Sequence, residues 1–185
     1  MANQPAAAAD FKRETLPQMT ATQLEITDIP SNPLDLLEQV AELHDWPADR
    51  LSDEELLICT PGSWCHYQIT ITYRGELESL HVAAAFDMRV PKAKISDACV
   101  LVARINEQLW LGHFDLWSDS GSLIFRHGLT LAGGAGVTPE QCEGLMEIAV
   151  EACERYYPCF QFLMWAGKKP EEALAAALFE TQGHA

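Results

Sequence analysis

The sequence predicts an α+β fold, in which a single antiparallel sheet has helices packed on one of its faces. Segments 64–73 and 77–88 alternate apolar with polar residues, and the turn sequence Arg74-Gly75-Glu76 joins them. Alternation that leaves one face polar is typical of an antiparallel sheet covered on one side. Between residues 90 and 111 the apolar residues instead recur at three- and four-residue steps, as in a helix that lies on such a sheet.

The stretch from Val90 to Trp117 organises the predicted fold. Pro91 stands where a first-turn proline belongs, and Gly112 can adopt the left-handed conformation that ends a helix. Beyond the glycine, residues 113–117 alternate as in a strand. We therefore expect a helix, a glycine stop and a strand. The apolar stripe of this helix consists of Ile95, Ala98, Val102, Ile105 and Leu109.

The flanking segments complete the order α-β-β-β-α-β-β-α. Asn32 and Pro33 are residue types that cap and begin a helix, and Pro47 limits its length. Thr138-Pro139-Glu140-Gln141 has the form of a capping box and predicts a helix that Pro158 interrupts. The other expected elements are strands at 54–60, 64–73, 77–88, 113–117 and 122–131, a helical piece at 160–166 and a final Ala-rich helix at 171–181.

The predicted organisation is a flexible N-terminal extension, residues 1–30, followed by a single α+β domain, residues 31–185, with extra C-terminal helical segments. The formal net charge of −15 disfavours nucleic-acid partners and anionic membranes, because both attract clustered Lys and Arg. We see neither the pattern of a secretory signal nor an apolar run of the ~20 residues that a membrane span needs. We therefore expect a cytoplasmic protein.

The six cysteines fit small buried side chains in a reducing compartment, since none forms a C-x-x-C pair. Cys65 and His66 cannot form a nucleophile–base pair, because neighbours on a strand point to opposite faces. Cys59 with His81 is the other conceivable pair. No G-x-S-x-G, H-E-x-x-H or phosphate-loop motif occurs, and the glycine-rich loop before Thr138 lacks a lysine. The sequence therefore predicts no catalytic residue and no cofactor.

Four histidines and one aspartate fall in the predicted strands. Aligned on neighbouring strands, they could bind zinc or act in acid–base chemistry. Only His113 and Asp115 are closely spaced, so polar positions on an open sheet face are the simpler interpretation, with no metal. A metal- or small-molecule-binding domain or enzyme that uses this face is the alternative function. The residues are His66, His81, His113, Asp115 and His127.

Large aromatic residues concentrate near one hairpin and two helix ends. Most are expected in the core, but Trp110 and Trp117 flank the helix–strand turn and fall off the apolar stripe. Tryptophan is favoured at protein interfaces. We predict that Trp110, Phe114 and Trp117 form a partner or dimer interface. A cluster of Arg89, Lys92 and Lys94 at the start of the central helix is interpreted as a solvated face.

The passage Asn106-Glu107-Gln108-Leu109-Trp110-Leu111-Gly112-His113-Phe114, the Cys153-Glu154-Arg155-Tyr156 segment and the element order resemble the YbjN family of bacterial sensory-transduction regulators. The resemblance covers roughly residues 33–165 and rests on an N-x-x-L-x-x-G-x-F pattern rather than a catalytic fingerprint. It implies a fold similar to type III secretion chaperones, which are acidic homodimers that bind segments of other proteins. It supplies no catalytic residues.

These observations together predict a non-enzymatic cytoplasmic regulator or chaperone-like module. It would form a homodimer through the central helix and the strand beside it, and bind a protein or peptide partner. A purely structural subunit of a larger complex is a further alternative.

Overall fold

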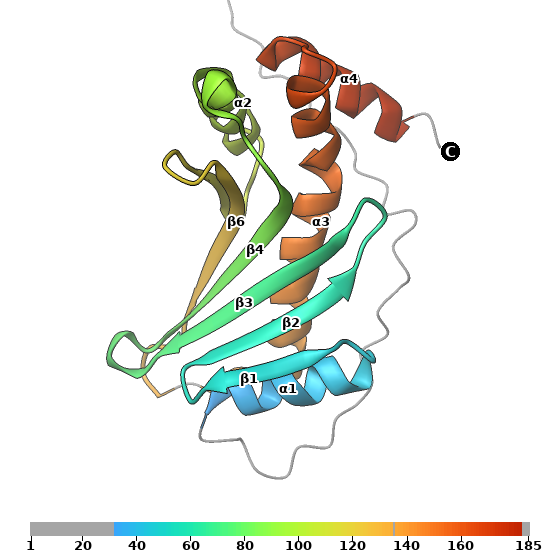
Figure 1. The fold of residues 1–185 in the computed structure, drawn as a ribbon. Helices are drawn as coiled ribbons and strands as arrows, with labels where there is room; N and C mark the ends of the chain where they lie inside the picture. Colours follow the sequence, from blue (N-terminus) through green and yellow to red (C-terminus); the bar gives the residue numbers. More distant parts are fainter. Residues whose placement is uncertain (1–31, 135, 183–185) are drawn as a thin grey trace, which may run out of the picture.

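The computed structural model describes residues 32–134 and 136–182, so the predicted extension at residues 1–30 lies outside the described part. Six strands form one antiparallel sheet in the order β1-β2-β3-β4-β6-β5 (Figure 1). The elements are α1 (Pro33–Leu43), β1 (Ala48–Ser52), β2 (Glu55–Pro61), β3 (His66–Arg74), η1 (Gly75–Leu77), β4 (Ser79–Arg89), η2 (Lys92–Lys94), α2 (Ile95–Asn106), β5 (His113–Trp117), β6 (Ser122–Thr130), α3 (Pro139–Met164) and α4 (Pro170–Gln182).

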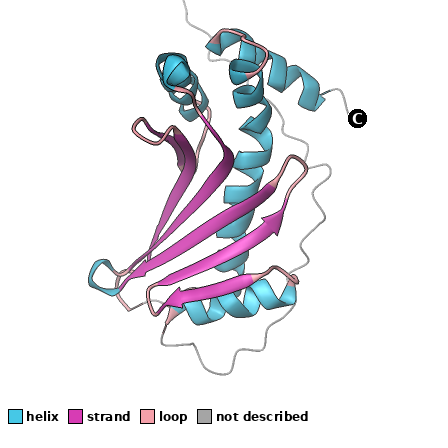
Figure 2. Ribbon diagram, viewed as in Figure 1, coloured by secondary structure: helices cyan, strands magenta, loops and turns pink. Residues whose placement is uncertain are grey.

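Helices cover one face of the sheet. The helices α1 and α3 lie behind the sheet in the view of Figure 2, where α1 contacts β1 to β3 and α3 contacts β4 and β6. The helix α2 packs on β5, and α4 packs on α3 and α2 at the upper end of Figure 1. Within the described residues, no helix covers the opposite face, which we call the open face. The predicted fold class is therefore confirmed.

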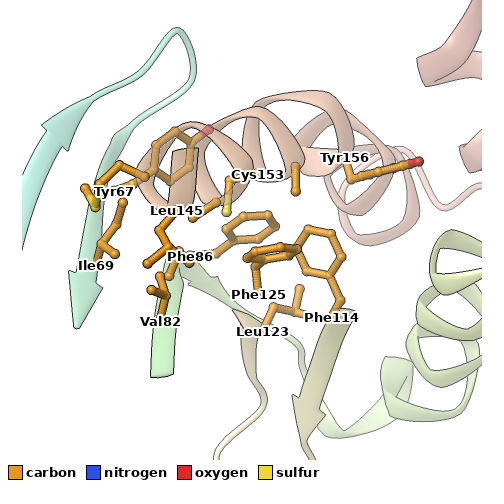
Figure 3. Close-up of a cluster of buried hydrophobic side chains, with 14 of the residues drawn as sticks. Tyr67, Ile69, Val82, Phe86, Phe114, Leu123, Phe125, Leu145, Cys153 and Tyr156 are labelled. Carbon is orange, nitrogen blue, oxygen red and sulfur yellow. The ribbon is translucent and has the colours of Figure 1, made fainter. Parts of the chain in front are cut away.

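The core lies between α3 and the covered face. The predicted alternation is confirmed. Tyr67, Ile69 and Ile71 of β3 point into the core, and so does every second residue of β4 from Leu80 to Met88. Figure 3 shows the aromatic rings that meet at its centre. The ring centroids of Phe86 and Phe114 lie 5.7 Å apart, within the range of favourable aromatic contacts.

The predicted helix starts have their expected caps. The Asn32 side chain accepts a hydrogen bond from the Leu34 N–H at 3.0 Å, and Pro33 follows it. Thr138 accepts from the Gln141 N–H at 3.2 Å, while the Gln141 side chain accepts from the Thr138 N–H at 3.0 Å. The predicted capping box is therefore present at the start of α3.

One strand, β1, was not predicted. It consists of Ala48-Asp49-Arg50-Leu51-Ser52, a short polar segment with little strand propensity. Tertiary contacts hold it, since it pairs with β2 and Arg50 forms ion pairs with Asp35 at 3.2 Å and Glu38 at 3.0 Å on α1. The sheet therefore has an additional edge strand, and the predicted order lacks it.

The central helix is shorter than predicted. Pro91 precedes the 3₁₀ turn η2, and α2 proper ends at Asn106, before Leu109. Leu109 still packs against the core, but from the loop that follows the helix. Gly112 therefore ends that loop rather than the helix, with the predicted left-handed φ of 70°.

The prediction that Pro158 breaks the C-terminal helix was wrong, because α3 runs without interruption from Pro139 to Met164. Proline has no N–H to donate to the carbonyl four residues earlier, which belongs to Glu154. That carbonyl instead accepts a hydrogen bond from the indole Nε1–H of Trp64 at 3.1 Å. The Trp64 ring also stacks on Tyr157, with centroids 6.1 Å apart. Trp64, at the tip of the β2–β3 hairpin, thus supplies the hydrogen bond that Pro158 cannot donate.

Gly112 allows a change of stability to be predicted. A Cβ at this position would lie 2.2 Å from Cζ of Phe125, on a backbone with a φ of 70°. We expect Gly112→Ala to lower the free energy of unfolding by about 2–5 kcal/mol, measured by urea denaturation. Gly144→Ala in α3 is the control, because a Cβ there meets nothing within 4 Å and should add about 0.5–1 kcal/mol. Equal stability of the two variants would contradict this account.

Candidate functional site

Exposed large apolar side chains occur on α2, on the loop that follows it and on the outer strand β5. Trp110 in the loop is 99% exposed, and Trp117 at the end of β5 is 55% exposed. Leu111 of the same loop and Val100 of α2 are also exposed. We call this group, Val100, Trp110, Leu111 and Trp117, the aromatic edge. Exposed aromatic side chains of this kind are candidates for contact with a partner.

The side chain of Asn106 fixes the loop that carries Trp110. Its Nδ2 donates to the Phe114 carbonyl at 3.0 Å, and its Oδ1 accepts from the Phe114 N–H at 2.8 Å. These are the two bonds that a neighbouring strand would make with Phe114. Gly112 packs its backbone against Phe125 at the other end of the loop. The N-x-x-L-x-x-G-x-F pattern is thus a structural lock that holds Trp110 and Leu111 at the surface.

Phe114 is not at the surface, in contrast to its predicted place in an interface. Its side chain is 1% exposed and packs in the core against Phe86, Phe125 and Phe160. Along β5 the residues alternate, so the helix on the covered face buries Phe114 and leaves Trp117 outside. The interface role of Trp110 and Trp117 stays a prediction.

At the outer edge of β5, the backbone N–H and C=O of one residue, Leu116, are available for pairing. The N–H and C=O of Phe114 point away from β6 toward Asn106, so those of Leu116, two residues further, also point outward. In the part of the chain that the structure describes, no group bonds to them. Unpaired edge groups of this kind can pair with another chain.

The open face carries a polar cluster from three adjacent strands. Arg126 of β6 donates from Nε to Nε2 of His81 at 3.0 Å, and from Nη1 to Oδ2 of Asp115 at 2.8 Å. His113 Nε2 lies 3.7 Å from the same Asp115 oxygen. Burial and the charge of Arg126 lower the pKa of His81, which is consistent with a neutral ring that accepts a hydrogen bond.

The sheet brings together only part of the predicted histidine group. His127 lies opposite Val82 on the covered side, where burial lowers its pKa, and His66 is exposed at the start of β3. Among residues 32–134 and 136–182, no three His, Cys, Asp or Glu side chains are placed to hold a metal ion. Arg126, which links His81 to Asp115, was not singled out in the sequence because its partners lie on other strands.

The predicted nucleophile pairs find no support in the geometry. Strand β3 lies between Cys59 and His81, and their rows in the sheet differ, since Cys59 aligns with Ala85. Burial and the carboxylate of Asp87 raise the pKa of Cys65 to about 11, so its thiol stays protonated near neutral pH.

The glycine-rich loop, and Arg89 of the basic cluster, also have plain structural explanations. Gly133 and Gly134 both have positive φ, which fits a turn, and the Thr138 cap beyond them is used within its own helix. Arg89 donates to the Ser120 carbonyl at 3.2 Å.

None of the described helices is long and apolar enough to cross a bilayer.

These features define a class of domain: an antiparallel sheet with helices on one face, an open second face and an aromatic edge. The family described as "Putative bacterial sensory transduction regulator", YbjN, matches residues 33–162. The chain therefore belongs to the YbjN family, as the resemblance of its central passage predicted.

Two solved structures are similar to this chain. The crystal structure of YbjN from E. coli has 15% sequence identity and a TM-score of 0.50, and the match covers 83% of this chain and 96% of that chain. The crystal structure of the ExsC-ExsE complex has 18% identity and a TM-score of 0.46, over 70% of this chain and 93% of that chain. No curated protein matches the chain. At these identities the first similarity concerns the fold alone.

The Asn106 lock can be tested by mutation. Asn106→Ala removes both hydrogen bonds to Phe114, so we expect the free energy of unfolding to fall by about 1–3 kcal/mol. Hydrogen exchange of the Phe114 amide should accelerate. Gln108→Ala, an exposed change in the same loop, should stay within about 0.5 kcal/mol of wild type. Unchanged exchange at Phe114 in the Asn106 variant would argue against the lock.

The lowered pKa of His81 predicts how stability changes with pH. The unfolded chain, with an ordinary histidine pKa of about 6.5, binds a proton more readily than the folded chain. Lowering the pH from about 7 to 5 should therefore reduce stability, and His127 acts in the same direction. His81→Gln keeps an acceptor for Arg126 and should make this dependence less steep. The free energy of unfolding is measured by urea titration at each pH, with pH 8 as the reference. If it falls with decreasing pH as steeply in His81→Gln as in the wild type, the assignment to His81 is wrong.

Proposed function

We propose that this chain is a non-enzymatic, cytoplasmic regulator or chaperone-like module that acts as a homodimer and binds a protein or peptide partner. The aromatic edge is the observation that carries the proposal. Trp110 is 99% exposed, yet Asn106 and Gly112 hold its loop in one conformation. A preformed tryptophan anchor loses little conformational freedom on binding, which is why such residues dominate interface energies.

A second copy of the chain fits the aromatic edge. Two β5 strands related by a twofold axis would each offer the outward N–H and C=O of Leu116 to the other, as antiparallel pairing requires. The exposed side of α2 carries small residues, Ser96, Cys99 and Ala103, beside Val100. Small side chains let two helices or a helix and a strand approach closely. The Asn106 lock would confine such pairing to the end of β5.

Charge supports this surface over the others. Two copies with a formal net charge of −15 repel each other, so their contact should avoid unpaired carboxylates. Close to the aromatic edge, Glu107 lies 3.3 Å from Arg104, and Asp115 lies 2.8 Å from Arg126. Near the aromatic edge, Asp97 and Asp119 have no such partner among the described residues, and acidic residues of that kind are more numerous on the exposed sides of α1 and α3, where Glu42, Glu140, Glu147 and Glu151 lie.

The proposal predicts that Trp110→Ala weakens self-association without unfolding the chain. Because its side chain is 99% exposed, its removal should leave the free energy of unfolding of the monomer within about 0.5 kcal/mol. Loss of an interface tryptophan should raise the dimer dissociation constant about 30-fold or more, measured by sedimentation equilibrium. Trp117→Ala should act in the same direction.

Trp165→Ala is the matched control. Trp165 is 67% exposed but lies at the C-terminal end of α3, outside the aromatic edge. Its removal should leave the dissociation constant unchanged. Native mass spectrometry of the untagged wild-type protein should show twice the chain mass, alone or with an added polypeptide. A monomeric wild type, or dimers equally stable in Trp110→Ala, would show that the interface assignment is wrong.

A further inference from the structure

Gly128 in the middle of β6 is not required by the backbone conformation or by tight packing among the described residues. Glycine weakens a strand interior and occurs there for a bulge, a positive φ, tight packing or the close approach of another group. The register with β4 runs without a break on both sides of Gly128, and its φ is not positive. A Cβ would meet only the Leu80 carbonyl oxygen, at 3.8 Å. The absence of a side chain leaves room for the close approach of another group.

The missing side chain helps to form a hollow on the open face. The hollow is shallow and open to solvent, and its volume is about 540 Å³. Its floor follows from the register: Thr72, His81 and Gly128 align across β3, β4 and β6. Arg74, Ser79 and Thr130 align in the next row. Leu77, which is 66% exposed in η1, supplies an apolar wall.

The lining offers hydrogen-bond donors and no carboxylate. The Nε2 of His81 accepts from Arg126, so the neutral ring carries its proton on Nδ1, which bonds to no described group. Thr72, Ser79 and Thr130 add hydroxyls. Arg74 is the single cation of the lining; one of its nitrogens pairs with Glu54 at 2.7 Å, and a guanidinium has further N–H groups.

We propose that this hollow binds a small aliphatic monocarboxylate. The carboxylate accepts hydrogen bonds from His81 and the hydroxyls, Arg74 supplies the positive charge, and the aliphatic part lies against Leu77. One cation, already shared with Glu54, matches a single negative charge better than a phosphate dianion. In a chain with a net charge of −15, a lining that itself holds no carboxylate favours an anion. The carboxylates at its border include Glu54, which pairs with Arg74, and Glu55, which aligns with Thr72. This site goes beyond the proposed dimer and lies on different strands from the aromatic edge.

The experiment is a titration of the full-length protein with butyrate, followed by two-dimensional NMR. The amide of Gly128 and the imidazole of His81 should show saturable shifts. Butyramide has the same shape without the charge, and it should bind about ten-fold more weakly or worse. Gly128→Val fills the hollow with a side chain that suits a strand, so it should abolish the saturable shifts. Gly144→Ala in α3 should bind butyrate as the wild type does.

The proposal is overturned if butyrate gives no saturable shift at these two residues, or if butyramide binds equally well. It is also overturned if Gly128→Val binds as the wild type does, or if the shifts centre on Arg89, Lys92 and Lys94. If Gly128→Val does not fold, the Arg74→Gln variant tests the proposal in its place. This exposed change must weaken butyrate about ten-fold and leave butyramide binding unchanged.

Discussion

The packing of α3 across one face of the sheet is the contact on which the rest of the structure depends. Phe86 and Phe114 stand at its centre, and their rings meet Phe160 of α3 at 5.6 and 5.8 Å. Large rings of this kind contribute most of the buried apolar area in a small core. Because the described helices occupy one face, the other face stays open, and the hollow lies on it. The strand order separately leaves β5 at the edge of the sheet.

Phe114 connects that core to the surface. Its side chain belongs to the aromatic cluster, while its backbone is bonded to the Asn106 side chain. The position of the Trp110 loop is consequently set by the same residue that packs against α3. A partner that contacts Trp110 would meet a loop that is already ordered, so little conformational entropy would be lost on binding.

The sequence was sufficient where the pattern is local. Two-residue alternation predicted β3 and β4, and the Thr138 cap predicted the start of α3, because both depend on neighbouring residues only. The strand β1 could not be predicted in this way, since Arg50 is held there by carboxylates on α1. Likewise, alternation separates Phe114 from Trp117 but does not say which face a helix covers. The Arg126–His81 contact joins residues 45 positions apart, and only the strand order reveals it.

The hydrogen bond between Trp64 and the Glu154 carbonyl has a consequence for how this sequence can change over generations. While Pro158 is present, loss of the indole N–H leaves that carbonyl without the bond that replaces the one proline cannot make. If Pro158 is first replaced by a residue with an N–H, the helix can supply its own bond, and loss of Trp64 then removes only its stacking on Tyr157. The two substitutions are therefore tolerated in one order and penalised in the other. The order of the two substitutions therefore matters, although the strands β3 to β6 lie between Trp64 and Pro158 in the sequence.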